Sequence, residues 1–287
     1  MKKIALVLVL VGLTNLLFSQ SLLWKISGKN LKSPSYFYGT IHIQDQRVFA
    51  FDSTVLKAIA SCDAFAMEIL MDKLDPVQLK GAMYMPKGKV LSNMMSKEDF
   101  VLLDSVCKAK LGASAIFFNT MKPFFLSSAL EQMEMPQDET EALDLFFLKT
   151  ARSQEKSCFG LEEYMDQIKA IDAFKMKDQV DMLLQYVRDT VGQNAEEFDA
   201  LLQAYLTFDF DKMLDLMSGT DYPKKFQKVL VDKRNITMAN EFERIAQQQT
   251  LFAAVGAAHL AGEKGVLALL KKRGYTVEPV LFNWVSK

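Results

Sequence analysis

Histidine is scarce in this chain of 287 residues, with two copies, and no excess of basic residues is present. Lys and Arg number 34 against 35 Asp and Glu, which gives a net charge of −1. Without a basic excess, nucleic-acid binding is excluded as the main activity. Half of the residues are hydrophobic and 24% are charged, so the chain can build a large core and is not generally disordered.

The sequence signatures of several enzyme classes are also missing. The chain contains no P-loop, no G-x-G-x-x-G, no G-x-S-x-G elbow and no EF-hand loop. It contains no H-E-x-x-H, which excludes a hydrolase of the zincin type. It contains no C-x-x-C-H, which excludes covalently attached haem.

Cysteine occurs only at Cys62, Cys107 and Cys158, without any C-x-x-C spacing. A zinc knuckle and a thioredoxin-type redox motif are therefore excluded. In an exported protein one disulfide could form, and Cys62 with Cys158 is the best pair because both just precede predicted core strands. Three buried thiols are an equally good interpretation.

The first twenty residues are unlike the rest of the chain. Lys2 and Lys3 precede an apolar stretch over residues 4–18, which small and polar residues follow. This order is typical of a secretory signal peptide, and about 15 apolar residues are short for a membrane span. We expect cleavage near Gln20 and an exported protein, periplasmic or secreted, with no stable membrane span. An uncleaved N-terminal anchor is the alternative.

The remaining residues predict an α/β fold. Apolar and β-rich runs bounded by turn residues predict strands at 23–27, 35–41, 64–70, 156–161, 251–256 and 276–282. Amphipathic helices fill most of residues 96–247, for example 141–152, 164–174, 177–191 and 195–208. We therefore expect a central mixed or mostly parallel sheet flanked by helices, with a large helical insertion in the middle of the chain. No Gly/Ser linker divides it, which favours a single domain over residues 21–287.

The two histidines share one local pattern. His42 ends Gly39-Thr40-Ile41-His42, and His259 ends Gly256-Ala257-Ala258-His259, so each is the last residue of G-x-x-H. Each motif follows a predicted apolar strand. Residues just beyond the carboxyl ends of strands line the ligand crevice in open α/β sheets. A shared context for the only two histidines favours a functional pair over two unrelated structural side chains.

A carboxylate ends another predicted strand. Glu68 follows four apolar residues, where it either reaches the crevice or is buried at a cost of several kcal/mol unless paired. A glutamate that merely marks the exit into solvent is the alternative. Two histidines and one carboxylate are a common ligand set for a catalytic divalent metal. The sequence thus predicts a metal site formed by His42, His259 and Glu68.

Four stretches of the chain together resemble the TraB/PrgY/GumN family, which includes the Tiki-type metalloproteases. They are Leu23-Trp24-Lys25-Ile26 with Tyr38-Gly39-Thr40-Ile41-His42; Ala66-Met67-Glu68-Ile69; Leu143-Asp144 with Gly160-Leu161-Glu162-Glu163 and Gln167; and Arg234-Asn235 with Met238-Ala239, residues 255–260, Gly262, Gly265 and Gly274. They span about residues 22–282, and the last stretch is the most specific. The resemblance implies an α/β fold related to erythromycin esterases and haem-binding ChaN proteins.

The resemblance also implies an active site formed by both G-x-x-H histidines and the strand-end glutamate. Tiki-type members are metal-dependent proteases supported by manganese or cobalt, whereas other members are linked to pheromone shutdown. We therefore expect a hydrolase that uses manganese, cobalt or zinc to activate water against a peptide or small acyl substrate. Glu68 would belong to both the metal site and the catalytic set.

Three further residues are expected to support this chemistry. Arg234 would stabilise an oxyanion or hold a substrate carboxylate. Asn235 would orient a ligand or substrate. Glu162 would be a partner of a metal ligand or a proton shuttle. Either three ligands suffice for the ion, or a fourth would come from elsewhere, with Asp45 and Glu162 as the candidates.

Two other functions remain open at this level. A metal-free esterase would use one histidine as general base. A non-catalytic exported protein would bind or sequester a peptide or haem, with a histidine as the axial haem ligand.

Overall fold

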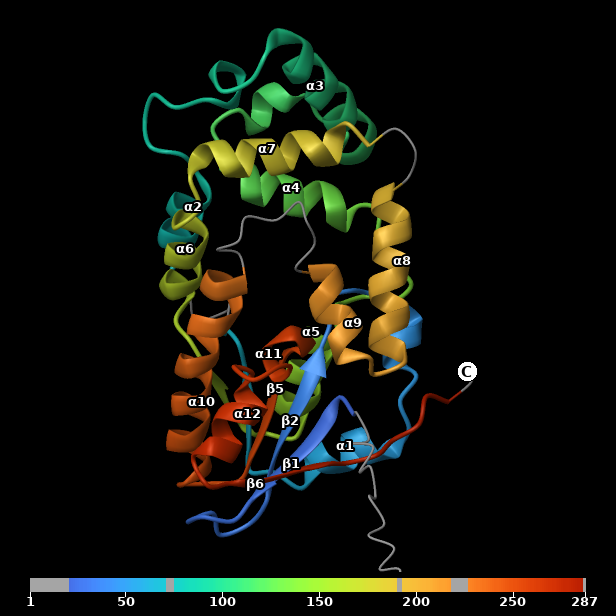
Figure 1. Ribbon diagram of the computed structural model, residues 1–287, viewed down its shortest axis with the longest axis vertical. Coiled ribbons are helices and arrows are strands. Elements are labelled where there is room, and N and C mark those ends of the chain that lie inside the picture. Colours follow the sequence, from blue (N-terminus) through green and yellow to red (C-terminus); the bar gives the residue numbers. More distant parts are fainter. Residues whose placement is uncertain (1–20, 71–74, 190–192, 218–226, 286–287) are drawn as a thin grey trace, which may run out of the picture.

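The computed structural model describes residues 21–70, 75–189, 193–217 and 227–285. A six-stranded sheet forms the lower half of the molecule in Figure 1. Its strands are β1 (Leu23–Ser27), β2 (Ser35–Thr40), β3 (Ala64–Met67), β4 (Ser157–Gly160), β5 (Leu251–Gly256) and β6 (Thr276–Pro279). The expected signal peptide lies outside the described residues.

The strand order is β4-β3-β5-β2-β1-β6. Neighbours from β4 to β2 are parallel, whereas β1 pairs antiparallel with both β2 and β6. The predicted mixed, mostly parallel sheet is thus confirmed. Because the four parallel strands point the same way, their carboxyl ends form one edge, which is where ligands bind in open α/β sheets.

Helices cover both faces of the sheet and continue beyond its carboxyl edge. They are α1 (Ser53–Ala60), α2 (Pro76–Met83), α3 (Lys97–Leu111), α4 (Pro123–Gln132), α5 (Leu143–Ser153), α6 (Tyr164–Asp172), α7 (Met176–Val187), α8 (Gln193–Leu206), α9 (Phe210–Met217), α10 (Lys233–Ala246), α11 (Ala257–Leu260) and α12 (Val266–Lys272). In Figure 1, α3, α4 and α7 lie together at the end of the molecule toward which β2 points. Among the described residues, no helix has the length and apolar character needed to cross a bilayer.

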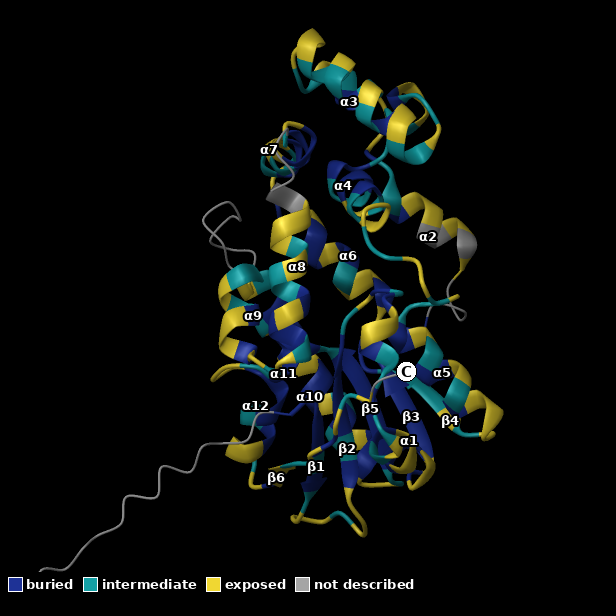
Figure 2. Cartoon of the chain, turned by 90° about the vertical axis from the view of Figure 1, so that its right-hand side faces the viewer, coloured by how far each residue is buried: buried dark blue, intermediate teal, exposed yellow. Residues whose placement is uncertain are grey.

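Alternating residues of β2 fix helices on opposite faces of the sheet. Tyr38 packs edge-on against Phe147 of α5, with ring centroids 5.0 Å apart. Phe37, its neighbour, stacks on Phe242 of α10 at 4.3 Å. Successive side chains of a strand point to opposite faces, so α5 and α10 enclose the sheet between them. Figure 2 shows the strands as the most continuously buried part of the molecule.

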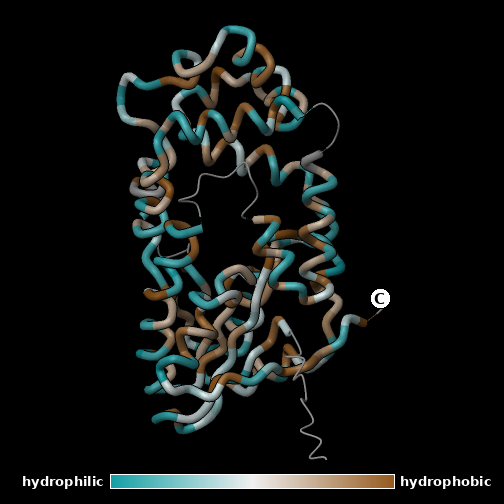
Figure 3. The backbone as a smooth tube through the Cα atoms, in the orientation of Figure 1, coloured by the Kyte–Doolittle hydropathy of each residue, from teal (hydrophilic) through white to brown (hydrophobic). Residues whose placement is uncertain are grey.

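The helical middle of the chain has apolar clusters of its own. One joins α3, α4 and α7 through residues such as Leu103, Leu126 and Leu183, all fully buried. A smaller one includes Ile168 of α6 and Leu230. Hydrophobic and hydrophilic residues alternate along these helices, as Figure 3 shows, which is the pattern of amphipathic helices. β4 interrupts this helical region and pairs with β3, so the insertion is anchored in the sheet.

The disulfide interpretation is wrong. All three cysteines lie among the described residues, and none of them forms a disulfide. Phe65 lies opposite Cys158 in the parallel pair of β3 and β4, and Cys62 is three residues earlier. Burial raises the pKa of the Cys62 thiol to about 12 and that of Cys107 to about 11.

Gly39, the glycine of the first G-x-x-H motif, lets the second motif pack against β2. A Cβ at Gly39 would lie 3.1 Å from Ala257 Cα and 3.1 Å from Leu260 Cδ1. Both contacts are tighter than ordinary van der Waals distance, and one of them is to backbone. The absence of a side chain at Gly39 therefore allows α11, which carries His259, to lie against the strand that precedes His42.

We expect Gly39→Ala to lower the free energy of unfolding by about 1–3 kcal/mol, because a methyl group is forced into a closed contact. Gly81→Ala, at an exposed position of α2, is the matched control, since a Cβ there meets nothing within 4 Å. In that helix alanine should be neutral or stabilising by up to about 1 kcal/mol. Urea unfolding of both variants checks this, and equal stability of the two would contradict the packing argument.

Candidate functional site

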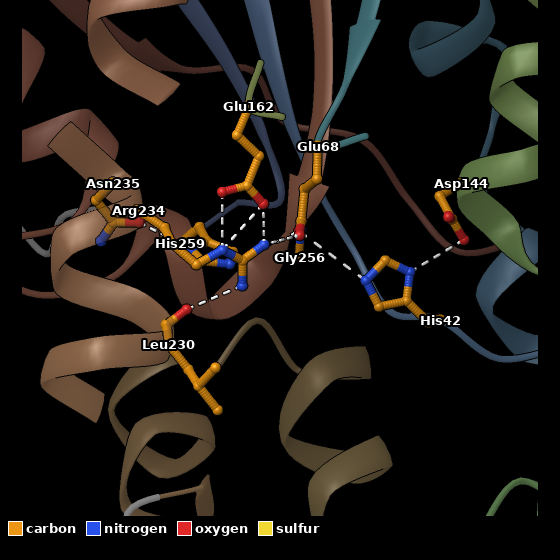
Figure 4. Close-up of polar contacts among 9 residues, drawn as sticks. All are labelled: His42, Glu68, Asp144, Glu162, Leu230, Arg234, Asn235, Gly256 and His259. Carbon is orange, nitrogen blue, oxygen red and sulfur yellow. Dashed lines mark hydrogen bonds and ion pairs between the residues drawn. The ribbon is translucent and has the colours of Figure 1, made fainter. Parts of the chain in front are cut away.

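The four parallel strands each deliver one polar side chain to the same edge of the sheet. His42 follows β2, Glu68 follows β3, Glu162 follows β4 and His259 follows β5. The Glu162 N–H donates to the Glu68 backbone carbonyl at 3.0 Å, which sets the two glutamates side by side. In Figure 4, Arg234 of α10 contacts Glu162 and Glu68, with His259 beside it and His42 on the far side of Glu68. Residues far apart in the sequence thus form one cluster, as parallel strands require.

Arg234 is held between the two glutamates. Its Nε donates to both Glu162 oxygens at 2.9 Å, and its Nη2 donates to Glu162 Oε1 and, at 2.6 Å, to Glu68 Oε2. Its Nη1 donates to the Leu230 carbonyl at 2.9 Å. Leu230 belongs to a π-helical segment, Lys228–Asp232, that leads into α10. A rigid guanidinium fork thereby fixes the direction of both carboxylates.

Burial and charge set the protonation of the two glutamates. Burial by itself would raise the pKa of Glu68, but electrostatic interactions with His259, Arg234 and His42 outweigh it and lower that pKa to about 2. Burial raises the pKa of Glu162 above its ordinary value, although Arg234 opposes this. Glu68 is therefore a carboxylate at neutral pH, as a metal ligand or a charge-stabilising group must be.

The hydrogen bonds of Asn235 fix the tautomer of His259. The Lys264 carbonyl can only accept, so the Asn235 Nδ2 at 2.9 Å is the donor and the amide oxygen points the other way. That oxygen lies 2.6 Å from His259 Nδ1, which must therefore carry the proton. Burial lowers the pKa of His259 to about 4, so the ring is neutral. Its Nε2 lone pair then faces Glu68 Oε1 at 3.7 Å.

His42 is the accessible histidine of the pair. Its side chain is 58% exposed, whereas that of His259 is 7% exposed. Its Nε2 lies 3.9 Å from Glu68 Oε1, and its Nδ1 lies 3.2 Å from Asp144 Oδ1 of α5. Desolvation opposes protonation, but the contact with Asp144 outweighs it and raises the pKa of His42 to about 9. Both histidines thus direct Nε2 at the same oxygen of Glu68.

Gly256 leaves open the point where these groups converge. Its N–H donates to Glu68 Oε1 at 2.7 Å. A Cβ at Gly256 would lie 3.2 Å from Glu68 Oε1, 3.7 Å from His259 Cδ2 and 3.9 Å from His42 Nε2. The backbone there has a negative φ of −51° that any residue can adopt. Glycine is therefore required at this position for lack of space, not for its backbone conformation. A side chain would occupy the centre of the cluster.

The predicted metal site is not preformed. Among the described residues, no three His, Cys, Asp or Glu side chains are already arranged as ligands of one ion. Both Glu68 oxygens accept N–H groups, from Gly256 and Arg234. The donor chemistry and the space at Gly256 nonetheless fit a divalent ion, because two imidazole nitrogens converge on one carboxylate.

The other predicted residues take definite places. Asp45, one candidate for a fourth ligand, accepts hydrogen bonds from the backbone N–H of Arg47 at 2.8 Å and from Arg47 Nε at 2.9 Å. Glu162 and Arg234 pair with each other, and Asn235 contacts His259. Asp144 lies in the Leu143-Asp144 pair that contributes to the family resemblance, and no local pattern in the sequence predicts its contact with His42.

The fold and site define a class: an α/β protein with a His–Glu–Arg cluster at the carboxyl edge of its parallel strands. The profile of the TraB/PrgY/gumN family matches residues 22–279, and the chain belongs to that family. No solved structure matches the chain.

Its similar relatives include named metalloproteases. The chain is 22% identical to Metalloprotease TIKI homolog of Amphimedon queenslandica, over 90% of this chain and 61% of that protein. It is 20% identical to Metalloprotease TIKI2 of Danio rerio, over 93% of this chain and 63% of that protein. It is 21% identical to Metalloprotease TIKI1 of Xenopus tropicalis, over 90% of this chain and 61% of that protein. The chain thus spans about three fifths of the length of these relatives.

We expect Arg234→Met to lower the free energy of unfolding by about 3–5 kcal/mol, since it leaves two buried carboxylates without their countercharge. Arg244→Met on the same helix is the matched control. Arg244 is half exposed and pairs with Glu241 three residues earlier, so its loss should cost about 0–1 kcal/mol. Chemical unfolding measures the free energy of unfolding of both variants. An equally small decrease in both would show that the ion pairs of Arg234 do not stabilise the fold.

Proposed function

We propose that the chain is an exported metal-dependent hydrolase that cleaves a peptide, with a divalent ion held by His42, His259 and Glu68. The observation that carries the proposal is the convergence of two imidazole Nε2 atoms on one oxygen of Glu68. The names of the metalloprotease relatives support it. The export part depends on the signal-like residues 1–20.

Formal charge at the cluster supports a divalent cation. Glu68, Glu162 and Asp144 are three carboxyl groups, and Arg234 is one permanent cation. A metal ion that binds His42 displaces the proton from its ring, as it must from any ligating imidazole. With both imidazoles then neutral, the ionised carboxylates leave two negative charges in a largely buried place. Uncompensated buried charge is costly, so a doubly positive ion suits the site. Manganese, cobalt and zinc all accept this donor set.

The residues around the ligands keep them in place. Asn235 holds His259 with Nε2 facing the cluster, and Arg234 turns Glu68 toward the histidines. Most N–H groups of Arg234 are already bonded, so a holding role fits its contacts better than the oxyanion role expected from the sequence. Glu162 balances the charge of Arg234. A bound ion would lower the pKa of a coordinated water, which supplies the nucleophile for hydrolysis.

The exposed side of His42 is the side from which a substrate can arrive. Glu68, Glu162, Arg234 and His259 are all at most 9% exposed, so they line the closed side of the cluster. A peptide or small acyl substrate would therefore approach past His42, with its scissile carbonyl directed toward Gly256.

We expect tag-free wild-type protein to bind about one Mn²⁺, Co²⁺ or Zn²⁺ per chain and to cleave peptides from a mixed library only with metal present. Gly256→Ala should weaken metal binding about tenfold or more, because its methyl group displaces Glu68 while all ligands remain.

His42→Ala should abolish the thermal stabilisation by metal, because it removes one of the proposed ligands. Calorimetry, thermal shift and mass spectrometry of the library provide the readouts.

Gly81→Ala is the control for the glycine substitution and should bind metal like the wild type. If the wild type binds no ion and His42→Ala behaves identically, the metallohydrolase proposal is wrong. Cleavage that persists in chelator would indicate instead a histidine general base. A Soret band on reconstitution with haem would indicate the haem-binding alternative.

A further inference from the structure

Asp144 has no function in the site as described so far, yet it lies against one of the two histidines. Its Oδ1 is 3.2 Å from His42 Nδ1 and is buried without a geometrically good hydrogen bond to any described group. Buried polar atoms normally have partners. The imidazole of His42 is the donor that faces this oxygen, as Figure 4 shows.

The fold fixes Asp144 and His42 relative to one another through backbone and core contacts. The Leu143 N–H, one residue before Asp144, donates to the Ile43 carbonyl, one residue after His42, at 3.3 Å. One turn further along α5, Phe147 packs against Tyr38 of β2. The start of α5 is thus joined to the end of the strand that presents His42, and the backbone at Asp144 is held beside His42.

The two histidines need different support because they differ in exposure. His259 is buried, and a neutral amide, Asn235, holds its Nδ1. The His42 side chain is 58% exposed, so water competes for its nitrogens and its ring keeps rotational freedom unless a group restrains it. A carboxylate accepts more strongly than an amide. Asp144 supplies that stronger acceptor at His42, the ring of the pair that is harder to hold in place.

We infer that Asp144 is a positioning residue for His42: its carboxylate accepts a hydrogen bond from Nδ1–H and so aims Nε2 at the point between Glu68 and His259. Histidine ligands of metals commonly donate their second ring N–H to a carboxylate, which orients the ring and raises its basicity as a ligand. The part that concerns metal binding depends on the proposed function; the orientation of the ring does not.

The test uses tag-free protein labelled with ¹⁵N-histidine, in which only two rings give signals. In the metal-free wild type we expect a hydrogen-bonded Nδ1 proton on both rings. Asp144→Ala should lose the His42 signal to exchange with water and keep that of His259. Asp144→Asn should restore it in part, because an amide oxygen can accept as Asn235 does. Asp166→Ala, which removes an exposed first-turn aspartate from α6, is the control and should change neither signal.

Titration with Zn²⁺ alone gives the second readout. Asp144→Ala should weaken zinc binding about 10–100-fold, with Asp144→Asn in between and Asp166→Ala like the wild type. An unchanged His42 proton signal in Asp144→Ala, or unchanged zinc affinity beside a zinc-binding wild type, overturns the inference. If the wild type binds no zinc but the His42 signal is lost as expected, the positioning role stands and the proposed function fails.

Discussion

The site depends on one desolvated guanidinium. Arg234 lies between Glu68 and Glu162, and its hydrogen bonds to both leave neither carboxylate free to rotate. Without that charge, two carboxylates at adjacent strand ends would repel each other in a buried place. With it, Glu68 remains ionised and turns one oxygen toward the histidines. The π-helical segment before α10 contributes as well, because its Leu230 carbonyl accepts a hydrogen bond from Nη1 of Arg234.

The two G-x-x-H motifs are alike in sequence but differ in what each glycine does. Gly39 lies within β2, where the missing Cβ admits α11 and with it the second motif. Gly256 ends β5, where the missing Cβ opens the space between the histidines and Glu68. The first glycine therefore positions the element that carries His259, and the second preserves the room in which both histidines meet. The repetition reflects two steric requirements of one site.

Local patterns in the sequence were sufficient for much of the fold. The strands at 23–27 and 251–256 have the predicted bounds. β3 and β6 end three residues earlier than predicted, because the last three residues of each predicted strand lie beyond the residues that are paired with a neighbouring strand. Histidine scarcity and the shared motif pointed to His42 and His259, and the carboxylate at the end of an apolar strand pointed to Glu68. The pairing of Arg234 with Glu162, and the contact of Asp144 with His42, could not be predicted. These contacts join segments 72 and about 100 residues apart, and nothing in local periodicity encodes which charges will meet.

The histidines divide the site into a fixed side and an open side. His259 is buried, neutral and held by an amide whose own orientation the Lys264 carbonyl determines. His42 is exposed and faces a carboxylate, so proton and cation compete for its Nε2. The proposed uptake of an ion and of a substrate requires one rigid wall and one accessible ligand. The burial of Glu68, Glu162 and Arg234 supplies the wall, and the exposed edge at His42 is the only described part of the cluster open enough to serve as the entrance.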